Sequence, residues 1–237
     1  MNINGYVFSG ECATDTVDDT GVGADKLITQ LPVDVGDIDN ISYFRSSAGH
    51  DASDDFEDCR SMKHYIEPIT KLNDTNNVYS PFDGIVISMT TEEGNNFSDD
   101  GKTNQRISIR PTANPAYEVT LYHVDVLSSL NLTVGTAVNA GDHLGYGRLV
   151  RINSDSSDTT PSASNDFDIQ AKVLTPSGIR AVSVFQLMED SVFTSFSAFG
   201  SSVSDFIITK SQRDADALTC EGETFTSSGS LGSWILP

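Results

Sequence analysis

Three short segments carry side chains that could bind a metal ion or move a proton. The first, HDASD, places His50 and Asp54 four residues apart. At that spacing an imidazole and a carboxylate share one metal only on a helical turn or in a tight loop, because on an extended strand they would lie about 13 Å apart. The preceding Ala-Gly pair and the acids that follow favour a loop. His50 and Asp54 are therefore candidate ligands, although chance also produces such a pair in an Asp-rich chain.

The other two segments are expected on strands. LYHVDV places His123 on the same face as Leu121, where its ring either points into a groove or is bonded to backbone, the commoner outcome for a lone histidine. In DFDIQ, Asp166 and Asp168 are two residues apart, so both carboxylates face one way, about 6.6 Å apart. The two acids could reach a common ion, and a solvated polar face explains them equally well.

Short strands must position these side chains. Between about residues 78 and 173, the runs VYSPFDGIVISM, QRISIRP, YEVTLYHVDV and DFDIQAKV alternate apolar and polar residues, with turn residues between them. This pattern predicts a mainly β protein, an antiparallel sandwich or barrel. Asp55 to Met62 is expected to hold one helical turn. Apolar residues from Phe185 to Phe199 recur at helical spacing, which predicts an amphipathic helix ended by Gly200.

Composition narrows the classes of partner. The chain has 237 residues, enough for one large or two small domains, with 34 acidic and 14 basic residues and a net charge of −20. Such a field repels phosphate backbones and anionic lipid heads, which argues against nucleic-acid and membrane-surface binding. No apolar run approaches the roughly 20 residues that span a bilayer, so membrane insertion is not expected.

Several features favour an extracellular or cell-surface location. Lys is scarce, Asp, Ser and Thr are abundant, and four N-x-S/T sequons occur, at Asn40, Asn73, Asn96 and Asn131, which a chain of this composition also produces by chance. The first twelve residues lack the basic and apolar regions of a signal peptide.

Three cysteines, Cys12, Cys59 and Cys220, allow one disulfide in three possible pairings. We favour Cys59–Cys220, which would tie a C-terminal segment to the core and close a very long loop. Three unpaired thiols are the equally weighted alternative.

The order of these motifs resembles the lysostaphin-type (LytM-like) zinc metallopeptidases. In that family an HxxxD motif supplies two zinc ligands before a strand opened by a Pro-x-x-Gly turn, a later Tyr-His carries a catalytic histidine, and a Gly-rich hairpin follows. The matching positions here are His50 and Asp54, Pro81 to Gly84, His123, and Val134 to Gly145. The resemblance covers roughly residues 46–175 and implies a barrel-sandwich hybrid built from a duplicated hybrid motif. We expect this LytM-like β domain over 46–237, with one or two C-terminal helices as an extension, and an N-terminal arm or edge segment over 1–45.

The chain departs from the family at the last motif. Where the family has His-x-His, this sequence reads Asp166-Phe167-Asp168. The implied metal ligands are then His50, Asp54 and Asp168, with Asp166 as a possible addition. Such a set favours a harder cation over the zinc of the family, weakens the Lewis acid, and removes a group that shares proton transfer with His123. One divalent metal or none is compatible with this set.

Three functions follow. The leading hypothesis is an extracellular metallopeptidase-like protein that has lost hydrolysis and binds a cell-envelope peptide, a glycan or a protein partner. The alternatives are an active metal-dependent endopeptidase with an Asp-substituted site, and a self-associating structural protein of a surface assembly. A lipoyl-type carrier is set aside, because the hairpin at 138–142 has no lysine to modify.

Overall fold

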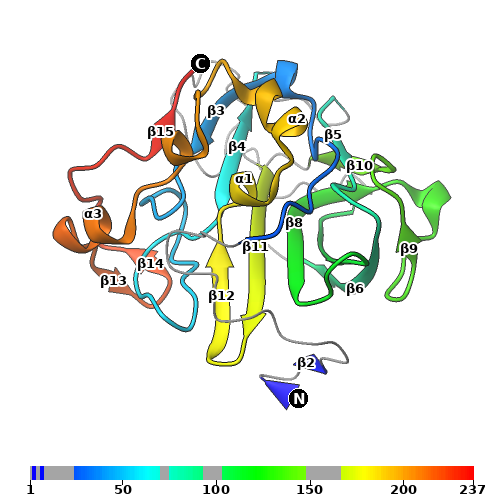
Figure 1. Ribbon diagram of the computed structural model, residues 1–237, viewed down its shortest axis with the longest axis horizontal. Coiled ribbons are helices and arrows are strands. Elements are labelled where there is room, and N and C mark those ends of the chain that lie inside the picture. The colour runs from blue at the N-terminus through cyan, green and yellow to red at the C-terminus, as the bar shows by residue number, and fades with distance from the viewer. Residues whose placement is uncertain (1, 4–5, 8–23, 70–74, 93–102, 148–166) are drawn as a thin grey trace.

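The computed structural model describes residues 2–3, 6–7, 24–69, 75–92, 103–147 and 167–237. Within these ranges one sheet of eleven strands dominates, in the order β15-β3-β4-β11-β8-β7-β6-β9, with β10 on β5 and β8 and with β12 on β11 (Figure 1). The pairs in this sheet are antiparallel. The mainly antiparallel β architecture expected from the alternating runs is confirmed.

The strands of the sheet are β3 (Ile38–Ser42), β4 (His64–Pro68), β5 (Asn77–Tyr79), β6 (Gly84–Thr91), β7 (Gln105–Pro111), β8 (Tyr117–Val126), β9 (Ala137–Val138), β10 (His143–Gly147), β11 (Phe167–Thr175), β12 (Gly178–Val182) and β15 (Trp234–Ile235). Two small hairpins pair β1 (Asn2–Ile3) with β2 (Tyr6–Val7) and β13 (Cys220–Glu221) with β14 (Thr224–Phe225). The helices are α1 (Val184–Leu187), α2 (Asp190–Phe193) and α3 (Lys210–Ala215), with 3₁₀ turns η1 (Val35–Asp37), η2 (Ser128–Leu130), η4 (Thr194–Phe196) and η5 (Val203–Phe206). None of the helices in the described ranges is long and apolar enough to cross a membrane.

Strand β11 lies at the centre of the sheet. Its side chains point alternately to a core face and to a polar face. Phe167, Ile169, Ala171 and Val173 alternate along it and join one apolar cluster. On the neighbouring strand β8, Leu121 stands opposite Ile169 and is equally buried. The intervening residues of β11 therefore point to the other face of the sheet, where the candidate site lies.

The predicted helix from Phe185 to Gly200 is wrong as a continuous element. Three short pieces, α1, α2 and η4, replace it, because the backbone of Met188 is extended and bridges Ile28. The amides of Leu27 and Ile28 both donate to the carbonyl of Leu187, each at 2.8 Å. This pairing with a segment 160 positions earlier takes the carbonyl out of the helical ladder, although the apolar residues of the pattern are still buried. The helical turn expected within Asp55 to Met62 is also wrong, since that segment is loop.

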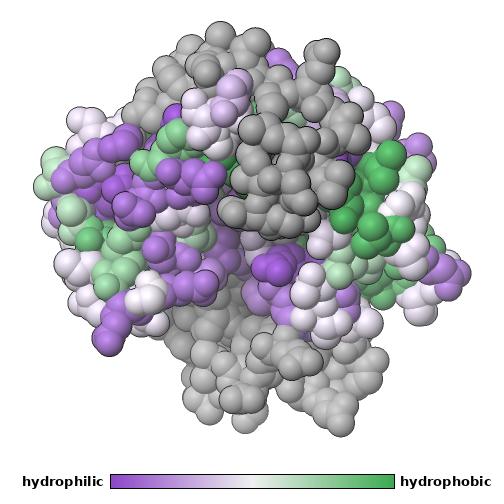
Figure 2. Space-filling view, turned by 90° about the horizontal axis from the view of Figure 1, so that it is seen from below, coloured by the Kyte–Doolittle hydropathy of each residue, from purple (hydrophilic) through white to green (hydrophobic). Residues whose placement is uncertain are grey.

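Part of the expected N-terminal arm belongs to the main sheet. Strand β3 lies between β15 and β4, so it is an interior strand. Ile28, Ile38 and Ile41 contribute to the same apolar cluster as the later strands. The face in Figure 2 is hydrophilic over much of its left, and hydrophobic residues gather at the right, the side on which β6 and β9 lie in Figure 1.

Candidate functional site

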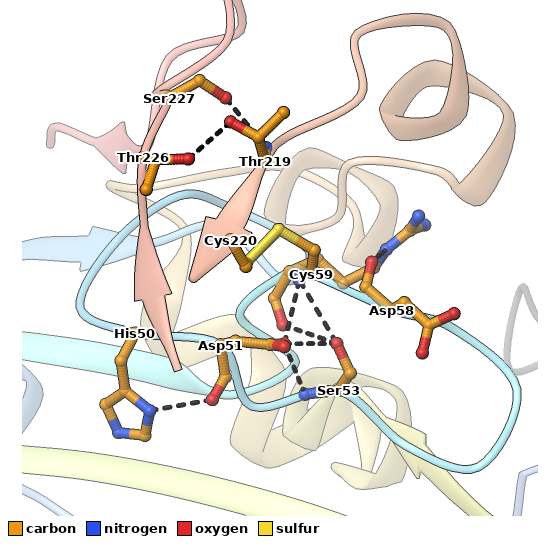
Figure 3. The surroundings of a disulfide bond; sticks show 10 residues. His50, Asp51, Ser53, Asp58, Cys59, Thr219, Cys220, Thr226 and Ser227 are labelled. Carbon is orange, nitrogen blue, oxygen red and sulfur yellow. Dashed lines mark hydrogen bonds between the residues drawn. A yellow bond between two sulfur atoms is a disulfide. The ribbon is translucent and has the colours of Figure 1, made fainter. Parts of the chain in front are cut away.

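His50 lies in the loop before β4, and its ring orientation is determined by its neighbours. Gly49 has a φ of 66°, and a side chain there would collide with the ring of Tyr65. The His50 amide faces the Tyr65 hydroxyl oxygen at 3.4 Å. Ring atom Nδ1 lies 2.8 Å from the carbonyl oxygen of Asp51, a contact drawn in Figure 3, so Nδ1 carries the proton. The lone pair of Nε2 is then directed at the Nζ of Lys63, 3.1 Å away.

Lys63 is the centre of the site. Its ammonium donates to Oδ2 of Asp168 as well as to the ring of His50. The side chains of Lys63 and Asp168 are only 3% and 1% exposed. The rings of Tyr65 and Tyr122 lie 4.7 and 4.5 Å from Nζ, so the cation also meets two aromatic faces. A positively charged atom therefore occupies the point between the His50 ring and the Asp168 carboxylate.

His123 reaches this site because β8 contains a bulge. Between Leu121 and Val124, both buried in the core, the pairing with β7 shifts its register, and His123 has a φ of 56°. The extra residue places Tyr122 and His123 together on the polar face, where the His123 ring approaches Asp168. The expectation that His123 shares a face with Leu121 is wrong, since strict alternation stops at the bulge.

The His123 ring lies between two carboxylates. Its Nδ1 is 3.0 Å from Oε2 of Glu92, and its Nε2 is 3.5 Å from Oδ1 of Asp168. The second distance is too long for a good hydrogen bond, and Oδ1 accepts none within the part of the chain that the structure describes. One oxygen of Asp168 is thus held by Lys63, while the other is buried beside an imidazole and accepts no hydrogen bond from the described residues.

Asp54 serves a different purpose. Its Oδ1 accepts the amides of Phe56 and Glu57 at 2.8 and 3.0 Å, and its Oδ2 accepts the amide of Ala181 at 2.8 Å. Burial raises the pKa of the Asp54 carboxyl, and the amides of Phe56 and Ala181 oppose that shift. The carboxylate thus attaches the loop to β12. Asp166 lies outside the described residues.

The predicted ligands that the structure describes do not form a set that fits a divalent ion. His50 and Asp168 meet at Lys63, and His123 lies beside Asp168, but the hydrogen bonds of Asp54 to described residues go to backbone amides. A metal placed between His50 and Asp168 would coincide with the Lys63 ammonium. Over the described ranges, no group of three or more His, Cys, Asp or Glu side chains is arranged to hold a metal.

Sequence reasoning missed the lysine at the centre and its neighbours Tyr65, Tyr122 and Glu92. The residues Met62–Pro68 are all buried in the structure, but their mixed sequence, MKHYIEP, does not indicate this burial. Once Lys63 is known to be buried, it requires a partner such as a carboxylate nearby. Nothing local indicates that this carboxylate is Asp168, 105 residues later.

A second buried ionic cluster and a disulfide support the loop that carries His50. Cys59 and Cys220 are bonded, with Cα atoms 5.7 Å apart, and this is the pairing favoured from the sequence (Figure 3). Arg45 binds both oxygens of Glu57 at 2.7 to 3.0 Å, and Arg60 adds a bond of 2.6 Å to the same carboxylate. The loop is thereby attached to the C-terminal segment.

An open hollow of about 370 Å³ lies between this loop and the β13–β14 hairpin. It adjoins the site, because it includes Gly49, and because the Asp51 amide donates to the carbonyl of Glu223 at 2.8 Å. Its lining is mostly small hydroxyl residues around one aromatic ring, namely Ser47, Gly49, Thr224, Phe225, Thr226, Ser227 and Ser228.

Comparison with known proteins gives little guidance. No family model and no curated protein matches the chain. One similar solved structure, provisionally described as the glycyl-glycine endopeptidase lytM of Ruminococcus gnavus ATCC 29149, shares 19% identity with a TM-score of 0.38 over 64% of this chain. The match covers 59% of that protein, so the chain spans about three fifths of its length. A likeness of this degree does not decide what this chain does.

Proposed function

We propose that this is a non-hydrolytic binding protein in which a lysine takes the place of the metal of a peptidase-like site. The observation that carries the proposal is the Lys63 ammonium held between His50 and Asp168. A metal peptidase needs an open coordination position at which its cation polarises water or a carbonyl. An ammonium offers neither an open coordination position nor an acidic bound water.

The hydroxyl-rich hollow supports a glycan as the bound partner. Serine and threonine hydroxyls both donate and accept, as the hydroxyls of a sugar require, and the ring of Phe225 can pack on the apolar face of a pyranose. The net charge of −20 favours a neutral polymer over an anionic one. We therefore place a neutral cell-envelope glycan first, before a peptide or a protein partner.

The disulfide supports an extracellular or cell-surface location. A bond between Cys59 and Cys220 persists in oxidising compartments and is rare in the cytosol. The acidic, lysine-poor composition agrees with such a location.

Metal content tests the replacement of the metal. Protein purified without chelator should contain no stoichiometric divalent metal by elemental analysis. Lys63→Ala should gain one zinc site in a titration, because it frees the His50 ring and the Asp168 carboxylate, and adding His50→Ala should remove that site. Lys210→Ala, which removes a lysine whose side chain is 35% exposed, is the matched control. Stoichiometric metal in the wild type that His50→Ala abolishes would contradict the proposal.

Sedimentation with insoluble neutral polysaccharides, chitin and cell-wall glycan among them, tests the ligand. The wild type should bind at least one of them, and Phe225→Ala should reduce binding about tenfold through loss of ring packing. Leu236→Ala, which removes an apolar side chain 65% exposed, should bind as the wild type does. Equal binding by the two variants would show that the hollow is not the site.

One observation favours the second candidate, an active metal-dependent endopeptidase. His50, His123 and Asp168 do converge, as a cation site would require, although Lys63 lies among them. Hydrolysis of oligoglycine or a cell-wall peptide that needs added metal and is lost in His123→Ala would establish it.

A further inference from the structure

We propose that Lys63 and Asp168 form an intramolecular amide bond, a covalent link between β11 and the residue that precedes β4. The two side chains are in direct contact. Condensation joins Nζ to Cγ, breaks one Cγ–O bond, and releases that oxygen as water. The inference does not depend on the proposed ligand, and the lysine fills the same position whether linked or not.

The surroundings of the pair exclude water. Lys63 and Asp168 are almost completely buried, at 3% and 1% exposed, and the rings of Tyr65 and Tyr122 flank the amine. Removal of two charges from water is costly, so a neutral amide is favoured over an ion pair in such a place. Exclusion of bulk water also protects the amide from hydrolysis.

His50 is placed to remove a proton from the amine. Its Nδ1–H is directed at the Asp51 carbonyl, so Nε2 presents a lone pair to Nζ at 3.1 Å. When Nε2 takes a proton from the ammonium, the free amine can attack Cγ of Asp168. A general base in this role must lie within hydrogen-bond reach of the proton that it removes, and His50 does.

His123 is placed on the other side of the carboxylate. Its Nε2 lies 3.5 Å from Oδ1, the oxygen that accepts no hydrogen bond from the described residues, so an imidazolium at His123 would direct a proton at that oxygen. Oδ1 receives one proton from His123 and a second from the attacking nitrogen, and it leaves as water. Solvent returns the proton held by His50 to His123, so the net change is one ammonium and one carboxylate converted to one amide and one water.

The chain contains a natural comparison in Lys210 and Asp214. These side chains also form a lysine–carboxylate contact, but they are 35% and 43% exposed on α3. Contact alone is therefore common to both pairs, whereas burial and two flanking imidazoles belong to Lys63 and Asp168. We expect the link at the buried pair alone.

Intact mass under denaturing conditions tests the proposal without requiring any variant to fold. The wild type should be lighter than its sequence by one water, about 18 Da, beyond the two hydrogens lost in the disulfide. Tandem mass spectrometry of a digest should find the peptides of Lys63 and Asp168 joined. A wild-type mass that lacks only the two disulfide hydrogens overturns the proposal.

Two variants locate the bond. Lys63→Arg keeps a cation but lacks the amine nucleophile, so the loss of water should disappear. Lys210→Arg should still show the loss of water. If the loss disappears in Lys210→Arg and not in Lys63→Arg, the bond joins Lys210 to Asp214 and the proposal is overturned.

The variant His50→Gln tests the role of the general base. Its side chain cannot take up the proton, so the linked fraction measured at a fixed time after synthesis should fall at least tenfold. An unchanged fraction overturns the role given to His50.

Discussion

The stretch from Arg45 to Lys63 contributes to two buried ion pairs that differ in chemistry. At one end, the guanidinium of Arg45 binds Glu57 through two nitrogens, and Arg60 binds the same carboxylate. At the other end, Lys63 meets only one oxygen of Asp168, and an imidazole lies beside each member of the pair.

The difference shows how two buried pairs in one loop can have different roles. A guanidinium remains protonated, is planar, and matches a carboxylate with parallel hydrogen bonds, which suits a scaffold. An amine is a point donor whose lone pair becomes available on deprotonation, which suits reaction. Glu57 is bound by Arg45 and Arg60, whereas Asp168 keeps one oxygen unbonded among the described residues. We therefore assign support to the first pair and chemistry to the second.

The largest expected effect comes from breaking the pair of Arg45 and Glu57, which we call the scaffold pair. Glu57→Gln should lower the free energy of unfolding by about 3–5 kcal/mol, because two buried guanidiniums lose their shared counter-charge. Urea unfolding followed by circular dichroism measures this. Glu223→Gln, at a side chain 84% exposed, should change it by less than about 0.5 kcal/mol. If both variants lower the free energy of unfolding by similarly small amounts, Glu57 stabilises the fold no more than an exposed surface glutamate does.

The next effect comes from the disulfide that joins the scaffold pair's loop to the C-terminal segment. Replacing both Cys59 and Cys220 by Ser should lower the free energy of unfolding by about 2–4 kcal/mol, because the bond closes a loop with a separation of 161 residues. The urea midpoint measures the change. An unchanged midpoint would mean that the contacts of Arg45 and Arg60 with Glu57 hold this loop without a contribution from the disulfide.

The pH dependence of stability tests a third buried site, His64. Its Nδ1 lies 2.8 Å from the carbonyl oxygen of Ser42 and its Nε2 2.7 Å from the hydroxyl of Ser183, both uncharged partners. Burial lowers the pKa of the His64 ring from 6.5 to about 4. The unfolded chain therefore takes up a proton below pH 6.5 that the folded chain refuses until about pH 4. Stability from this group is complete above the first value and is lost as pH falls towards the second, by about 3 kcal/mol in all.

Unfolding in urea at several pH values compares the wild type with His64→Gln, which cannot titrate. The variant should lose this part of the acid sensitivity, while the carboxylates affect both proteins equally. Parallel profiles would show that His64 is not held neutral.

The smallest expected effect on stability comes from Gly49, the residue that precedes His50 in its loop. Gly49→Ala should lower the free energy of unfolding by about 1–2 kcal/mol, because its φ of 66° disfavours a side chain and the new methyl would meet the Tyr65 ring. Gly36→Ala, which meets nothing within 4 Å, is the matched control and should change little. Equal stability of the two variants would mean that Tyr65 moves freely and does not hold His50.

The sequence by itself determined the alternating strands, the core face of β11 and the apolar residues after β12. Each depends on a period of two or of three to four residues, which records burial locally. The candidate residues His50 and Asp168 could also be found from the sequence, because few residue types can bind a metal ion or move a proton.

Only the tertiary structure decided what these residues do. A single extra residue in β8 turned His123 to the polar face, and strand pairing brought Lys63 to a carboxylate 105 positions away. The fold also places the Asp54 carboxylate where it accepts the amide of Ala181, and it interrupts the expected helix at Met188. Bulges, registers and long-range partners depend on the packing of the whole sheet, so no local period of the sequence encodes them.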